Sequence, residues 1–133
     1  MSDRIFLDAN ILVSAAWRAD GRLLVLWTLP DTQLLTSAYA IVEADRNVVS
    51  AEQRTRLHRL VQRLEIVDEP RPRRLPAVVS LPAKDVPILL AAIDAHATHL
   101  LTGDKDHFGT YYDQVIEGVR ILRPAKYLAL RAE

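Results

Sequence analysis

The stretch RIFLDANILVSA at residues 4–15 joins a short apolar run to a segment that favours a helix. Residues 4–7 end on Asp8, a pattern typical of a buried strand. Asn10 is a residue type that caps helices, and Gly21 would end the helix that follows. The stretch therefore predicts a strand, a turn and a helix, with a carboxylate at the carboxyl end of the strand.

The rest of the chain repeats this alternation of strand and helix. Further strands are predicted at 33–36, 64–67, 99–102 and 119–122. Further helices are predicted at 23–29, 37–48, 51–63 and 84–96 and from Pro124 onward, and loops at 68–83 and 103–109. Strands separated by helices predict an α/β fold with a parallel sheet covered on both faces. No internal repeat is visible, so residues 1–133 are expected to form a single domain.

Composition excludes several classes of protein. The absence of cysteine rules out a disulfide framework, a thiolate nucleophile and a cysteine-based zinc site. Seventeen basic and seventeen acidic residues cancel, so a polyanion would have to be held by a local basic patch or by a metal. The longest apolar run, Ile88 to Ile93, is too short to span a membrane. The N-terminus lacks the pattern of a signal peptide, and we expect a cytoplasmic protein.

Four carboxylates are predicted to meet at one rim of the sheet. Asp8 and Asp104 follow strands, Asp85 begins the helix that leads into the fourth strand, and Glu43 lies early in a helix after the second strand. In parallel sheets, ligands bind beyond the carboxyl ends of the strands. Clustered carboxylates repel one another, and Mg²⁺ or Mn²⁺ would relieve that repulsion and activate water for phosphodiester hydrolysis. As alternatives, Asp85 could be only a helix cap and Glu43 only a solvated charge.

Several motifs resemble those of the PIN-domain ribonucleases. They are FLDANILVSA at 6–15, VEADRNV at 42–48, LPAKDVPILLAAI at 81–93, LLTGDKDHFG at 100–109 and the closing IEGVRILRPAKYL. More narrowly, they resemble the toxin-like, VapC-type group of toxin–antitoxin systems, over nearly the whole chain. The resemblance implies a three-layer α/β/α fold with a five-stranded parallel sheet in the order 3-2-1-4-5.

The resemblance also implies a function and a set of site residues. It implies an endoribonuclease that depends on Mg²⁺ or Mn²⁺ and hydrolyses RNA, with a small antitoxin as partner and a homodimeric state. The implied catalytic and metal-binding residues are Asp8, Glu43, Asp85 and Asp104, with Glu43 preferred to Asp45. Asp106 is a possible accessory acid, and Asn10 and Thr102 are expected to orient ligands or water.

Other polar residues allow simpler interpretations. His96 and His99 do not have the spacing of a zinc site. His107 could contact a phosphate, but a local cap in its loop is the preferred interpretation. The basic residues of the predicted helix 51–63 are expected to form a solvated face. The loop arginines are candidate contacts to RNA or to an acidic partner, and they are Arg71, Arg73 and Arg74.

Two alternative functions remain at this stage. A receiver-like signalling module also alternates strand and helix, and it would use Asp68, Thr102 and Lys126. However, a receiver needs an acidic pair after the first strand, where this chain has a lone Asp8 followed by Ala9. The second alternative is a PIN fold retained for protein binding with little catalysis.

Overall fold

A central sheet organises the computed structural model, which describes residues 2–133. The sheet has six strands in the order β3-β2-β1-β4-β6-β5, and only β5 runs antiparallel to its neighbour. The strands are β1 (Asp3–Leu7), β2 (Thr32–Ser37), β3 (Glu65–Val67), β4 (His99–Leu101), β5 (Val115–Ile116) and β6 (Val119–Leu122). The five parallel strands thus have the predicted order, and β5 is an additional edge strand.

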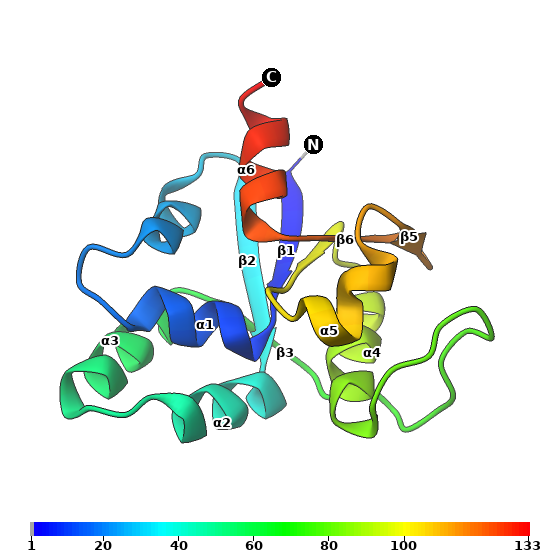
Figure 1. The fold of residues 1–133 in the computed structure, drawn as a ribbon, viewed down its shortest axis with the longest axis horizontal. Helices are drawn as coiled ribbons and strands as arrows, with labels where there is room; N and C mark the ends of the chain where they lie inside the picture. The colour runs from blue at the N-terminus through cyan, green and yellow to red at the C-terminus, as the bar shows by residue number, and fades with distance from the viewer. Residues whose placement is uncertain (1) are drawn as a thin grey trace.

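Helices cover both faces of this sheet. Figure 1 shows α1, α2 and α3 on one side of β1 and β2, with α4 and α5 on the other side. The α-helices are α1 (Ala9–Ala16), α2 (Ala38–Asn47), α3 (Ala51–Val61), α4 (Val86–Asp94), α5 (Lys105–Phe108) and α6 (Pro124–Arg131). Three 3₁₀ helices complete the fold, namely η1 (Arg22–Thr28), η2 (Ala83–Asp85) and η3 (Gly109–Tyr111). The predicted three-layer α/β class is confirmed.

The core forms where the apolar runs meet. Ile5, Phe6 and Leu7 of the central strand β1 have no exposed surface, because strands and helices cover them on every side. Helix α4 is buried from Ile88 to Ala92, and its Pro87 lies in the first turn, where proline costs no helical hydrogen bond. These two elements hold the middle of the sheet rigid next to its carboxyl ends.

Helix caps explain where several helices begin. The side chains of Ser37 and Ser50 accept hydrogen bonds from the first turns of α2 and α3. The prediction that Asn10 caps α1 is wrong. Asp8 is the cap, and it accepts from the Ala9 backbone amide at 2.7 Å, which leaves the Asn10 side chain free for other contacts.

Three short elements were not predicted. Helix α5 is a single turn within the predicted loop 103–109, η3 follows it, and β5 forms a hairpin with β6. The hairpin turn places Glu117 and Gly118 at positive φ, 48° and 88°, as a tight turn between antiparallel strands requires. Strands of two residues and helices of four are too short to produce a periodic pattern in the sequence.

The basic face of α3 differs from the solvated face that we expected. Arg56 donates to the backbone carbonyls of Ala16 and Trp17 at 2.8 and 2.9 Å, at the C-terminal end of α1. Carbonyls at the end of a helix lack intrahelical partners, so a guanidinium there stabilises the helix. Arg54 likewise binds the carbonyl of Asp45 and pairs with its carboxylate. Part of this basic face therefore joins helices to one another.

The strand order argues against a receiver module. In the receiver order 2-1-3-4-5, the third strand pairs with the first. Here β3 pairs only with β2 at the edge of the sheet, so Asp68 lies after an edge strand and away from the sheet centre.

Among residues 2–133, no helix is long and apolar enough to cross a membrane.

Candidate metal centre

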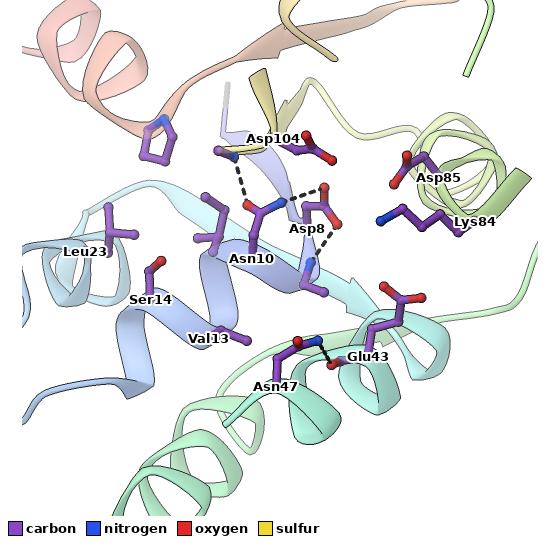
Figure 2. A pocket seen from close by; sticks show the side chains of 14 residues that line it. Asp8, Asn10, Val13, Ser14, Leu23, Glu43, Asn47, Lys84, Asp85 and Asp104 are labelled. Carbon is purple, nitrogen blue, oxygen red and sulfur yellow. Dashed lines mark hydrogen bonds between the residues drawn. The ribbon is translucent and has the colours of Figure 1, made fainter. Parts of the chain in front are cut away.

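The four predicted acids line one cleft. Asp8 follows β1 and Asp104 follows β4, and these two strands are neighbours in the sheet. Asp85 lies where η2 meets α4, and Glu43 projects from α2. The cleft has a volume of about 540 Å³, and Asn10 also lines it. Figure 2 shows the carboxylates of Asp8, Glu43, Asp85 and Asp104 around this cleft.

Asp8 is the most constrained of these carboxylates. It is only 4% exposed, and its Oδ2 accepts from the Thr102 hydroxyl at 2.8 Å and from the Asn10 amide at 3.1 Å. The Asn10 Oδ1 in turn accepts from the Gly103 backbone amide at 2.8 Å. These bonds connect the ends of β1 and β4 and fix the orientation of the Asp8 carboxylate. Asn10 and Thr102 therefore orient the Asp8 carboxylate, and their role in orienting ligands or water stays a prediction.

Asp85, Asp104 and His107 form a second group beside Asp8. The His107 Nδ1 lies 2.7 Å from Asp104 Oδ2 and 2.8 Å from Asp85 Oδ2, and ligand atoms of all three residues lie within 4.8 Å of one another. These contacts are close but poorly directed. Asp85 Oδ2 and His107 Nδ1 are buried without a hydrogen-bond partner. Buried polar atoms without partners are rare, and two of them facing one point suit a bound cation.

The electrostatics of the cleft favour the same conclusion. Burial raises the pKa of Asp8 to about 6, although hydrogen bonds from Thr102 and Ala9 oppose the shift, and the negative charge of Asp85 adds to it. Burial also raises the pKa of Asp85, where nearby His107 opposes the shift and Asp104 adds to it. Burial and repulsion disfavour the ionised form of these carboxylates, and a bound divalent cation would stabilise that form. The carboxylate oxygens suit a hard divalent cation, and the His107 nitrogen would be an additional donor.

The structure distinguishes Glu43 from Asp45, the two acids of α2 that were candidates for the site. Glu43 lines the cleft. Asp45 lies outside the cleft and pairs with Arg54 at 3.0 Å and with His58 at 3.3 Å, and these contacts lower the pKa of its carboxyl. The geometry therefore agrees with the preference for Glu43. Asp85 is at the N-terminus of α4, but its side chain makes no capping hydrogen bond.

The remaining predicted residues lie outside the cleft. Asp106 is exposed and is not part of the cleft lining. Arg73 forms a two-pronged ion pair with Asp94, at 2.6 and 3.0 Å. Arg71 and Arg73 line a separate hollow that also contains four acidic residues, Glu65, Asp68, Glu69 and Asp94. This acidic surrounding makes the loop a poor surface for a phosphate backbone.

Two residues, one in contact with the acids of the cleft and one in the cleft lining, were not predicted as site residues. The expectation of a local cap was too simple for His107, which bridges two carboxylates; its place three residues after Asp104 on a helical turn was the available signal. Lys84 also lines the cleft, and Figure 2 shows its amine directed between Asp85 and Glu43. Within residues 2–133, Lys84 has no ion pair within 4.0 Å. The Tyr39 hydroxyl holds this segment by donating to the Lys84 carbonyl at 2.6 Å.

The raised pKa of Asp8 predicts how metal-free stability depends on pH. Its folded value of about 6 exceeds the unfolded value of 3.8, so the folded state binds more protons between these values. The stability that the protonated carboxyl contributes is complete below pH 4 and is lost as pH rises through 6. Relative to Asp8→Asn, the parent should therefore lose about 3 kcal/mol of unfolding free energy between pH 4 and pH 7. Denaturant titrations in EDTA measure this difference.

Comparing the unfolding free energy of the parent with that of Asp8→Asn isolates the contribution of the Asp8 titration. The single amide oxygen that Asp8→Asn introduces cannot replace both carboxylate oxygens, one of which accepts from Ala9 and the other from Asn10 and Thr102, but that cost is the same at every pH. A difference between parent and variant that stays constant from pH 4 to pH 7 would contradict the raised pKa.

Comparison with known proteins supports the fold, but not the activity or the metal. No protein-family model matches the sequence, and no curated protein matches it significantly. A solved chain with a similar fold comes from a crystal structure of VapBC2 from Rickettsia felis bound to a DNA fragment from their promoter. The match has a TM-score of 0.64 and 18% identity, and it covers 90% of this chain and 98% of that chain. The fold implied by the motifs is confirmed.

Proposed function

We propose that this protein is a Mg²⁺- or Mn²⁺-dependent endoribonuclease and the toxin component of a type II toxin–antitoxin pair. The observation that carries the proposal is the convergence of four carboxylates on one cleft, at the carboxyl ends of β1 and β4. The likeness in fold to a chain of VapBC2 supports the assignment to a toxin–antitoxin system.

The cleft residues have distinct roles in this proposal. Asp8, Asp85, Asp104 and Glu43 would hold the metal, with His107 as a nitrogen donor beside two of them. A divalent cation at such a cluster supplies Lewis acidity for phosphodiester hydrolysis and lowers the pKa of water. Thr102 and Asn10 hold the Asp8 carboxylate in place, so little reorganisation accompanies the reaction.

Lys84 provides a cation on the opposite wall from Asp8. Its amine is not paired with a carboxylate within 4.0 Å among the described residues, so it is available to a phosphate oxygen. In the absence of substrate, its charge lowers the pKa of Asp85, which opposes the effect of burial. We assign Lys84 to binding the scissile phosphate.

The proposed activity predicts cleavage that depends on metal and on RNA. Purified protein should cut a labelled single-stranded RNA at internal positions in Mn²⁺ or Mg²⁺ and should leave it intact in EDTA. A DNA strand of the same sequence should be cut more slowly or not at all. Gel analysis of the products measures all three conditions. Cleavage that persists in EDTA, or none in either metal, would overturn the proposal.

The partner and the oligomeric state follow from the resemblance and are also proposals. We propose a small antitoxin protein as partner, because the neighbour in fold is a chain of a VapBC2 structure. We also propose a homodimer. Co-purification with the protein encoded immediately upstream tests the first, and light scattering of the isolated chain tests the second. Arrest of bacterial growth on expression, relieved by that upstream protein, would support the role of a toxin.

A further inference from the structure

A basic hollow lies beside the acidic cleft. It has a volume of about 400 Å³, and three cations line it, namely Lys105, Arg123 and Lys126. Asp113 is the only acidic residue in its lining. All three cations are exposed, and among residues 2–133 none has an ion pair within 4.0 Å. The hollow thus has excess positive charge in a protein whose total charge is zero.

The hollow and the cleft are built from the same two turns. Strands β4 and β6 are paired, with Leu101 opposite Leu122, so the turns that follow them are neighbours. Gly103, Asp104 and Pro124 line the acidic cleft. Their sequence neighbours Lys105 and Arg123 line the basic hollow. A polymer leaving the cleft across these turns would therefore enter the hollow directly.

Tyr112 connects the two sites and holds one of the cations. Its hydroxyl donates to the Thr102 carbonyl at 2.9 Å, and Thr102 binds Asp8 through its own hydroxyl. The Arg123 guanidinium lies over the Tyr112 ring, 5.9 Å from its centre, where a cation–π contact restrains it. Arg123 is therefore held at the rim of the hollow with its hydrogen-bond donors unused by carboxylates. Such a guanidinium suits the paired oxygens of a phosphate.

Several other arginines are already bound by groups of the protein. Arg54, Arg56 and Arg63 donate to backbone carbonyls. Arg73 binds Asp94, and its hollow contains more acids than bases. The hollow that adjoins the cleft thus combines free cations with a position next to the proposed reaction centre.

We propose that this hollow, formed by Lys105, Arg123 and Lys126 with Tyr112, binds backbone phosphates of single-stranded RNA on one side of the bond that is cut. This inference rests on the proposed function for the identity of the polymer, and it assigns the path that the strand takes out of the cleft. The cations act on phosphates, so the contact is insensitive to sequence and sensitive to salt.

The test measures RNA binding without cleavage. A short labelled single-stranded RNA is titrated in EDTA against the Asp8→Asn protein, and fluorescence anisotropy gives the affinity at several salt concentrations. Adding Lys105→Gln, Arg123→Gln and Lys126→Gln should reduce the salt slope of log affinity by about 2 and weaken binding on the order of 100-fold at about 0.1 M salt. Arg123→Gln alone should reduce the slope by about 0.7.

The matched control removes three other exposed cations, by Arg22→Gln, Arg46→Gln and Arg59→Gln, with the same change in net charge. Among residues 2–133 none of these three has an ion pair within 4.0 Å, and none lines the acidic cleft or the basic hollow. This control should keep the slope of the Asp8→Asn protein. An unchanged slope in the hollow variants, or equal losses in both triple variants, would overturn the inference. RNA binding through the hollow in a parent protein that cleaves no RNA would refute the proposed nuclease activity while supporting this binding site.

Discussion

Replacing Asp8 by asparagine is expected to lower the rate of metal-dependent RNA cleavage by about 1,000-fold while the fold is retained. Asp8 is buried at the end of the central strand and is aimed at the cleft by three hydrogen bonds. The substitution removes the charge of a proposed ligand and leaves its volume unchanged. Loss of an outer partner of a metal ligand costs about 10- to 100-fold, so loss of the ligand charge itself should cost more.

Initial rates of cleavage in Mn²⁺, at saturating RNA, measure this effect. The matched control is Asp20→Asn, because Asp20 is an exposed acid whose side chain is 77% accessible and lies outside the acidic cleft. The control should cleave at the parent rate, which shows that loss of an acid outside the cleft has no effect. The low rate of the Asp8→Asn protein, purified in the same way, would exclude a contaminating ribonuclease. An Asp8→Asn protein that cleaves as fast as the parent would remove Asp8 from the site.

Divalent metal is expected to raise the melting temperature of the parent by roughly 10 °C. Ions that bind only the folded state stabilise it by mass action, by about 2.7 kcal/mol at a hundredfold excess over the dissociation constant. For a domain of this size, each kcal/mol corresponds to roughly 3–5 °C. The carboxylates of the cleft, two with raised pKa values, provide the repulsion that the metal would relieve. Paired melts in EDTA and in millimolar Mn²⁺ measure the shift.

The Asp85→Asn variant tests whether the carboxylates act as one site. The Asp85 side chain makes no capping hydrogen bond, so its replacement removes a buried negative charge and its 2.8 Å contact with His107 without removing a helix cap. The variant should melt above the parent in EDTA, because the cost of burying this charge is removed and repulsion with Asp104 and Glu43 is reduced, and both effects exceed the lost attraction to His107. It should also respond less to Mn²⁺. Asp20→Asn should behave as the parent in both conditions. A full metal response in Asp85→Asn would show that Asp85 is not a ligand.

Much of the site could be predicted from local pattern because two of its acids lie at strand ends. A buried apolar run followed by an acid places Asp8 and Asp104 at the rim of a parallel sheet, whatever the detailed packing. The preference for Glu43 over Asp45 could also be predicted from the sequence, since the buried stripe of α2 fixes which side of the helix faces outward. The cap of α1 was misassigned because Asp8 and Asn10 are both residue types that favour caps.

Contacts between segments far apart in the chain could not be predicted from local sequence patterns. The close contact of His107 with Asp85 joins α5 to the start of α4, and the amine of Lys84 enters the cleft because Tyr39 of α2 binds the Lys84 carbonyl. Of the loop arginines expected to contact RNA or an acidic partner, Arg73 is bound by Asp94, and the roles of Arg71 and Arg74 stay predictions. A long, flexible side chain has many possible partners, and only the packed structure selects one.

The spacing of apolar residues and the order of the predicted strands and helices are read directly from the sequence. They were enough to predict the alternation of elements, the class of fold and the acids that line the cleft. Three other features became visible only in the folded chain: His107 joins the acidic cluster, arginines of α3 bind the end of α1, and a basic hollow adjoins the cleft. Each of these depends on which side chains meet in the folded chain, and that is decided by packing between residues far apart in the sequence.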